Sequence, residues 1–150
     1  MKSALQKKFF DSLVEVIRKT STELPDDVVR AIEAGKAVEA EGTSAKYAMG
    51  IITDNIGLAK KKSQPLCQDT GSILFFIHYP AKGVDYGVMT KLIKKAVATA
   101  TKKGYLRQNS VDSITGKNNG TNVGPGSPTI HAEPWNKDFF DIQIGRASCR

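Results

Sequence analysis

The feature that most constrains the fold of this chain is a nearly continuous apolar run, ILFFIHY, at residues 73–79. Gly71 precedes the run and Pro80 follows it, and both residue types interrupt regular structure. A short run that is rich in isoleucine and aromatic side chains has the length and composition of a strand. We therefore expect a buried strand here, with the other elements arranged around it.

Helical patterns lie on both sides of this strand. Apolar side chains recur at helical spacing over residues 3–19, 44–60 and 86–101. A shorter helix is expected to begin at Pro25 and to end at Gly35, because proline favours the first turn of a helix and glycine its C-terminal cap. Two glycines in the third of these helices, Gly50 and Gly57, are expected to permit close packing.

Two further strands are expected at residues 129–133 and 139–144, where they would complete a small sheet. A chain of 150 residues, with 40% hydrophobic and 25% charged residues, can bury the core of one domain. The expected fold class is α+β: a helical N-terminal portion, then a small mixed sheet with one helix and long loops.

The net charge of +7 comes from 22 lysines and arginines against 15 acidic residues. Lysines cluster at residues 60–62, 94–95 and 102–103, at or close to the ends of expected helices, where they complement the helix dipole. Proteins that bind single-stranded nucleic acid stack its bases on aromatic side chains interleaved with arginines. No such pattern surrounds these lysine clusters. We therefore expect solvated helix ends and attraction of a small anionic substrate, and no nucleic-acid partner.

Cellular location follows from what the sequence lacks. No stretch reaches 18 apolar residues, and no apolar segment of a signal peptide follows Lys2. Two cysteines, Cys67 and Cys149, cannot build a disulfide framework or, by themselves, a four-thiolate metal site. We expect a cytoplasmic chain that does not enter a membrane.

Cys67 is the first candidate for chemistry, because it lies in the polar segment SQPLCQDTG. It could be a buried apolar residue, a metal-ligating thiolate or a nucleophile. A nucleophile needs a base, and only His78 and His131 are available. His78 is expected to be a core or strand-end histidine, whereas His131 follows the long loop. No pair of cysteines or histidines has the spacing of a zinc site.

Two more candidates are a carboxylate and a guanidinium. Asp69 would lie on the same side of an extended loop as Cys67, where it can transfer a proton or, alternatively, cap a turn. Arg107 opens a long polar loop and can bind a carboxylate with two hydrogen bonds, or be an ordinary surface arginine. The segment GKNNGTNVGPG in that loop is rich in backbone N–H groups that could surround an anion.

Two blocks of sequence together carry a family resemblance. PLCQDTG, followed by the apolar strand, and then LRQNSVDSITGKNNGTNVGPGSPTIHAEPW resemble the amino-terminal half of the iron–sulfur hydro-lyases. This family contains the class I fumarases and the alpha subunit of L(+)-tartrate dehydratase. The resemblance extends from the first helix to about Trp135.

The resemblance implies roles for particular residues. Family members bind a [4Fe-4S] cluster through three cysteines, and Cys67 matches the first of these. Gln68 matches a residue that contacts a substrate carboxylate, Asp69 an acidic residue of the proton relay, and Arg107 an arginine that binds substrate carboxylate. The GTN stretch at residues 120–122 matches a loop near the active site, with no role assigned to it.

The resemblance further implies a function and partners. It indicates the alpha-subunit portion of a fumarate hydratase, with L(+)-tartrate dehydratase or a non-catalytic fragment as alternatives. The partners would be a beta subunit or a C-terminal domain, in an oligomer, and a small dicarboxylate. Only one of the three cluster ligands is expected here. The resemblance also implies that the proton-abstracting residue lies in the other domain or the beta subunit, with Asp69 as its partner, so the isolated chain would be inactive. Residues 1–143 are expected to belong to the hydro-lyase, and residues 144–150, which include Cys149, to a non-native tail.

Overall fold

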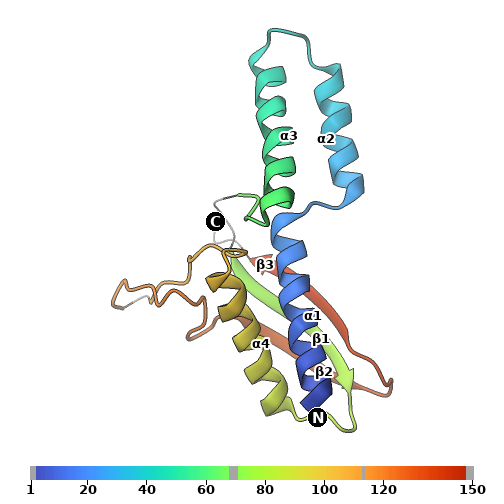
Figure 1. The fold of residues 1–150 in the computed structure, drawn as a ribbon, viewed down its shortest axis with the longest axis vertical. Helices are drawn as coiled ribbons and strands as arrows, with labels where there is room; N and C mark the ends of the chain where they lie inside the picture. Colours follow the sequence, from blue (N-terminus) through green and yellow to red (C-terminus); the bar gives the residue numbers. More distant parts are fainter. Residues whose placement is uncertain (1–2, 68–70, 113, 148–150) are drawn as a thin grey trace.

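The computed structural model describes residues 3–67, 71–112 and 114–147. In chain order the elements are α1 (Ser3–Thr22), α2 (Asp26–Val38), α3 (Ser44–Lys62), β1 (Ser72–Pro80), α4 (Tyr86–Lys102), β2 (Thr129–Trp135) and β3 (Asp141–Ala147). Figure 1 shows a body, in which α1 and α4 cover the sheet, and a helical hairpin of α2 and α3 that projects from it. The expected α+β class is confirmed.

The sheet is built around β1, in the order β2-β1-β3. β2 is parallel to β1, because the chain returns through α4 before it forms β2. β3 is antiparallel to β1, and Phe75 in the central strand lies between Ile130 of β2 and Ile144 of β3. The mixed sheet and its three strands agree with the sequence pattern.

One face of β1 forms the floor of the hydrophobic core. Ile73, Phe75 and Ile77 alternate along the strand and are at most 5% exposed. α1 and α4 cover this face with apolar stripes at helical spacing. The buried apolar residues that these two helices contribute are Phe9, Leu13, Val14, Ile17, Met89, Ile93, Ala96, Val97 and Ala100.

The opposite face of β1 differs from the expectation of a fully buried strand. In the part of the chain that the structure describes, no helix covers this face (Figure 1), and Phe76 is 46% exposed. His78 lies on the same face, with Nδ1 3.7 Å from Asp141 Oδ2 and Nε2 3.9 Å from Glu133 Oε2. It is therefore a half-exposed residue near the end of the strand, and the core alternative for this histidine is wrong.

The helical hairpin corrects the predicted end of α2. The helix continues through Gly35 and ends at Val38, with extended backbone at Glu39. Gly35 lies where α2 approaches α3: a Cβ there would be 3.3 Å from the Cε atom of Met49. The glycine permits contact between the helices rather than capping one of them.

The lysine clusters follow the prediction in two of three places. Lys60, Lys61 and Lys62 form the last turn of α3, and Lys102 is in the last turn of α4. The expectation that Lys94 and Lys95 lie near a helix end is wrong, because both are in the interior of α4. The ammonium of Lys95 lies 5.3 Å from the ring centroid of Phe10 in α1, at a cation–π distance.

The C-terminal segment is part of the sheet. Residues 144–147, where the expected tail begins, form the second half of β3, and Ala147 pairs with Ser72 at the start of β1. Residues 148–150, with Cys149, lie outside the described residues. Among the described helices, none combines the length and the apolar character that crossing a membrane requires.

Candidate active site

The segment that carries Cys67 is held by the ends of two helices. α3 terminates at Ser63, whose backbone is left-handed (φ 50°) and turns the chain. The amide of Leu66 donates to the carbonyl of Ser21 (3.1 Å), at the end of α1. The side chain of Asn55 in α3 donates to the carbonyl of Leu66 (2.7 Å). These bonds fix the backbone immediately before Cys67, whose side chain is exposed.

Two side chains of the long loop reach across to the same segment. Arg107 donates from Nε to the carbonyl oxygen of Cys67 (3.1 Å), although 40 residues separate them. Asn109 donates from Nδ2 to the carbonyl oxygen of Gly71 (2.9 Å). The structure therefore brings Cys67 and Arg107 together, and the loop contacts the CQDTG segment on both sides.

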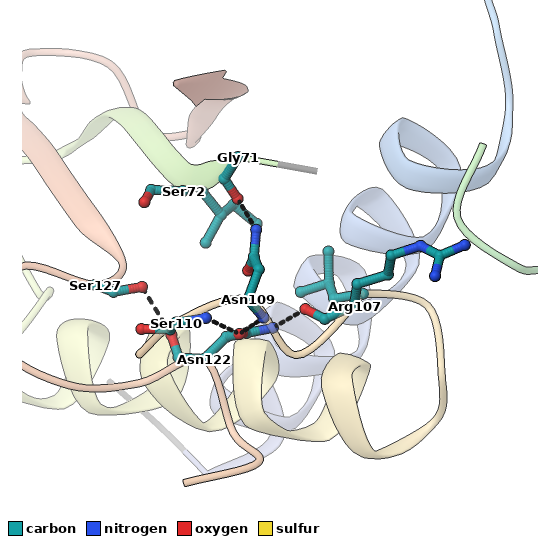
Figure 2. Close-up of a pocket in the computed structure, with 9 residues that line it drawn as sticks. Gly71, Ser72, Arg107, Asn109, Ser110, Asn122 and Ser127 are labelled. Carbon is teal, nitrogen blue, oxygen red and sulfur yellow. Dashed lines mark hydrogen bonds between the residues drawn. The ribbon is translucent and has the colours of Figure 1, made fainter. Parts of the chain in front are cut away.

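A small cavity lies beneath these contacts. It has a volume of about 10 Å³, which is room for one water molecule at most, and it lies between the start of β1 and the long loop. Figure 2 shows Asn109 and Asn122 directed into this region, whereas the Arg107 side chain extends away from it. The cavity is thus too small for a dicarboxylate, and the guanidinium points outward from the loop.

The glycine- and asparagine-rich part of the loop does not present free amides to an anion. The amide of Gly120 donates to Asn118 Oδ1 (2.7 Å), and the amide of Thr121 donates to Asn119 Oδ1 (2.9 Å). Val123 donates its amide to the hydroxyl of Thr121 (3.2 Å). Side chains of the loop itself thus occupy these donors, so the expected anion cradle is not formed by them.

An aspartate closes the turn that precedes this segment. Asp112 Oδ1 accepts hydrogen bonds from the amide of Thr115 (2.7 Å), the hydroxyl of Thr115 (2.9 Å) and the amide of Ile114 (3.1 Å). These bonds stabilise the carboxylate and hold the pKa of Asp112 below its usual value. The turn is therefore built around a charged acceptor.

The two histidines lie on the open face of the sheet. His78 is six positions along β1 from Ser72, which corresponds to roughly 20 Å. His131 stacks on Phe76, with ring centroids 5.0 Å apart, on the open face of the sheet. The contacts that the structure describes for both histidine side chains are thus with residues of the sheet.

The candidate residues Gln68 and Asp69 lie outside the described residues. Among the residues that are described, no three histidine, cysteine, aspartate or glutamate side chains are grouped to hold a metal ion. Cys67 is exposed, and it is not part of such a group among the described residues.

Sequence reasoning missed two asparagines of the site. Asn109 and Asn122 connect the long loop to its surroundings through their side-chain amides. The signal for Asn122 was the GTN stretch, to which no role was given. No sequence signal marked Asn109, because its partner is the backbone carbonyl of a residue 38 positions away, and any residue type carries that group.

Comparisons with known proteins show what the chain is similar to. A protein of Geobacillus stearothermophilus that is provisionally named a class I fumarate hydratase is 45% identical over 137 residues, covering 91% of this chain and 26% of the relative. The L(+)-tartrate dehydratase alpha subunit of Escherichia coli K12 is 36% identical, covering 73% of this chain and 36% of the relative. A Methanocaldococcus jannaschii protein provisionally named as that subunit is 36% identical, over 93% of this chain and 47% of its own length.

The chain thus spans between about a quarter and a half of the length of these relatives. The sequence profile of the fumarate hydratase (Fumerase) family matches residues 10–148, which includes the Cys67 segment, the long loop and all three strands. The chain belongs to the fumarate hydratase (Fumerase) family.

Proposed function

We propose that this chain is the amino-terminal portion of the alpha subunit of a cytoplasmic hydro-lyase that interconverts fumarate and malate. The observation that carries the proposal is the hydrogen bond from Arg107 Nε to the carbonyl of Cys67. It joins the two blocks of sequence that carry the family resemblance. A cation suited to a carboxylate therefore lies beside the one cysteine that is suited to a cluster.

Cys67 would hold one iron of a [4Fe-4S] cluster, and the other two cysteine ligands would come from outside the described residues. When bound, such a cluster supplies Lewis-acid chemistry toward the hydroxyl of a 2-hydroxy acid. The Cys67 side chain is exposed and the backbone before it is fixed by hydrogen bonds. Both features suit a cysteine that binds a cluster shared with another part of the enzyme.

Arg107 would bind one carboxylate of the substrate. Among the contacts between described residues, its guanidinium uses Nε, on the Cys67 carbonyl. The two terminal nitrogens then face outward and match the spacing of carboxylate oxygens. Gln68 would contact a substrate carboxylate beside Cys67, and Asp69 would take part in proton transfer. The positive charge of the chain would add long-range attraction for a dianion.

Fumarate is the favoured substrate because the relative with 45% identity is provisionally named a fumarate hydratase. L(+)-tartrate is the alternative, since two relatives at 36% identity are named for that reaction. The name of the Escherichia coli relative, a subunit alpha, supports a beta subunit as the partner of this chain. A C-terminal domain of the same polypeptide would serve the same purpose.

The proposal is tested with the complete enzyme, assembled anaerobically from this sequence and the missing part of the family protein. We expect a brown protein that hydrates fumarate faster than it dehydrates L(+)-tartrate. A preference for tartrate would replace fumarate by the alternative substrate. A colourless protein that turns over neither acid would contradict the hydro-lyase assignment.

A further inference from the structure

The most highly connected side chain near the candidate site is Asn122, which is 4% exposed. Its Nδ2 donates to the carbonyl of Arg107 (2.6 Å) and to the hydroxyl of Thr101 (3.1 Å). Its Oδ1 accepts from the amides of Asn109 and Ser110, each at 3.1 Å. Both donors and the acceptor of the amide group are therefore used (Figure 2).

The backbone at this position narrows the choice of residue. Asn122 has a φ of 56°, in the left-handed region that asparagine, aspartate and glycine tolerate best. Its carbonyl accepts a hydrogen bond from the hydroxyl of Ser127 (2.8 Å). Of the three tolerant residue types, only asparagine carries both donors and an acceptor in its side chain.

The contacts of Asn122 hold the backbone of Arg107 and of the residues that follow it. They fix the carbonyl of Arg107 and the amides of Asn109 and Ser110, so the backbone of residues 107–110 is held in place. The Thr101 hydroxyl, at the end of α4, connects this segment to a helix of the core. A side chain anchored on a rigid element restricts its neighbours more than one anchored on a loop.

We propose that Asn122 is a positioning residue: it holds residues 107–110 so that Arg107 meets the Cys67 carbonyl and directs its terminal nitrogens toward a dicarboxylate. The dicarboxylate part of this statement rests on the proposed function. Because Asn122 is buried and its amide group is fully hydrogen-bonded, it would act through the backbone of Arg107 rather than on the substrate.

Two variants test the proposal without forcing the backbone. Asn122→Gly keeps the left-handed conformation and removes the amide group, whereas Asn122→Asp keeps the acceptor and removes both donors. Asn119→Gly is the matched control, because Asn119 lies in the same loop and bonds only to Thr121 and Val123 among the described residues. Protection of the amides of α4 verifies that each variant folds.

The first readout is the NMR spectrum of this chain and does not depend on the reaction. We expect Asn122→Gly to lose the slow exchange of the Asn109 and Ser110 amides, and Asn122→Asp to retain it. The Arg107 Nε–H signal should move in both variants and stay unchanged in Asn119→Gly. An unchanged Arg107 signal in folded Asn122→Gly would overturn the proposal.

The second readout is steady-state kinetics of the complete enzyme. Both Asn122 variants should raise KM for fumarate, on the order of tenfold or more, with kcat and iron content near those of the unmodified enzyme. A KM that stays unchanged while the Arg107 signal moves would overturn the link to substrate. If the unmodified enzyme turns over neither fumarate nor tartrate, the proposed function fails, and the NMR readout still decides whether Asn122 positions Arg107.

Discussion

At the scale of single residues, the pairing of Arg107 with Cys67 defines the site. Arg107 uses Nε for the Cys67 carbonyl, which leaves a planar pair of nitrogens on its other side. Lysine cannot reproduce that geometry, because its ammonium is a single point of charge. The identity of the cation should therefore matter as much as its charge.

Arg107→Lys in the complete enzyme should lower kcat/KM for fumarate by roughly thirtyfold, which corresponds to about 2 kcal/mol for a lost charge-assisted contact. The effect should appear mainly in KM, as measured by initial rates over a range of fumarate concentrations. Arg30→Lys, at an exposed position on α2, is the control and should leave the kinetics unchanged. Kinetics of Arg107→Lys that match those of the unmodified enzyme would remove Arg107 from the binding site.

Asp112 gives a prediction about pH. Hydrogen bonds from the Thr115 amide, the Thr115 hydroxyl and the Ile114 amide hold its pKa below the usual 3.8. A carboxylate with a lowered pKa stabilises the fold above its usual pKa, and this contribution is lost as the pH falls through the lowered value. The amide signal of Thr115 should therefore titrate with a midpoint below 3.8. Asp112→Asn should abolish that transition, and a midpoint at or above 3.8 would contradict the assignment.

The sequence indicated Cys67 and Arg107 because each lies in a polar segment where its chemistry could be used, and the family resemblance then implied a role for each. It did not indicate Asn109 or the role of Asn122, because their partners are backbone groups of distant segments. A left-handed backbone at a single non-glycine residue leaves no periodic pattern. Such contacts become visible only when the loop is folded onto β1.

At the scale of elements, the glycines of the helical hairpin have roles opposite to those expected. Gly50 and Gly57 were expected to permit close packing, but a Cβ at either would meet no described atom within 4 Å beyond its chain neighbours and the nearby backbone of its own helix. Gly35, expected to end α2, is the one that faces Met49. Sequence spacing shows that a glycine interrupts a helical pattern, and it does not show which glycine faces another helix.

Gly50→Ala should stabilise α3 by about 0.5–1 kcal/mol, because alanine loses less backbone entropy in a helix and meets no neighbour here. Gly35→Ala should stabilise the hairpin by less than Gly50→Ala does, because the terminal methyl of Met49 must move away from the new Cβ. Urea denaturation of the two variants and the parent chain measures the difference. A midpoint for Gly50→Ala below that of the parent would contradict this account.

The strands show a further limit of sequence patterns. The run ILFFIHY predicted β1 correctly, but its apolar side chains on both faces also predicted burial on both faces. In the described chain only the face with Ile73, Phe75 and Ile77 is covered. A sequence pattern shows which residues can be buried, but not what covers them. A layer that buried Phe76 would have to come from outside the described chain.

At the scale of the whole molecule, the body and the helical hairpin differ in how many of their side chains are buried. The core cluster comes from α1, β1, α4 and the loop after it, whereas α2 has no buried residue and α3 has Ala59 alone among the described residues. Exposed apolar side chains remain on the hairpin, and they are Val28, Val38, Tyr47, Ile51, Ile52 and Leu58. The stability of the hairpin in this chain should therefore be local.

Hydrogen exchange of the isolated chain should occur in two steps. Amides of α2 and α3 should exchange through local opening well before those of β1 and α4, which require global unfolding. Mass spectrometry of peptides from each element measures the order. Equal protection of α2 and β1 would show that the hairpin is as firmly held as the core.

The proposed cluster depends on the number of cysteines that can bind it. The sequence has two cysteines, and the described residues contain no group of three or more histidine, cysteine, aspartate or glutamate side chains that could hold a metal ion. Under the proposed function, the remaining ligands would come from the part of the family protein that the relatives, two to four times as long, contain in addition.

The most direct test of the central claim is the iron and sulfide content of the complete enzyme when it carries Cys67→Ser, compared with Cys149→Ser. If Cys67 holds the cluster, Cys67→Ser should give a colourless protein without fumarate hydration, while Cys149→Ser keeps both the brown colour and the activity. A Cys67→Ser enzyme that retains iron, sulfide and turnover would contradict the account.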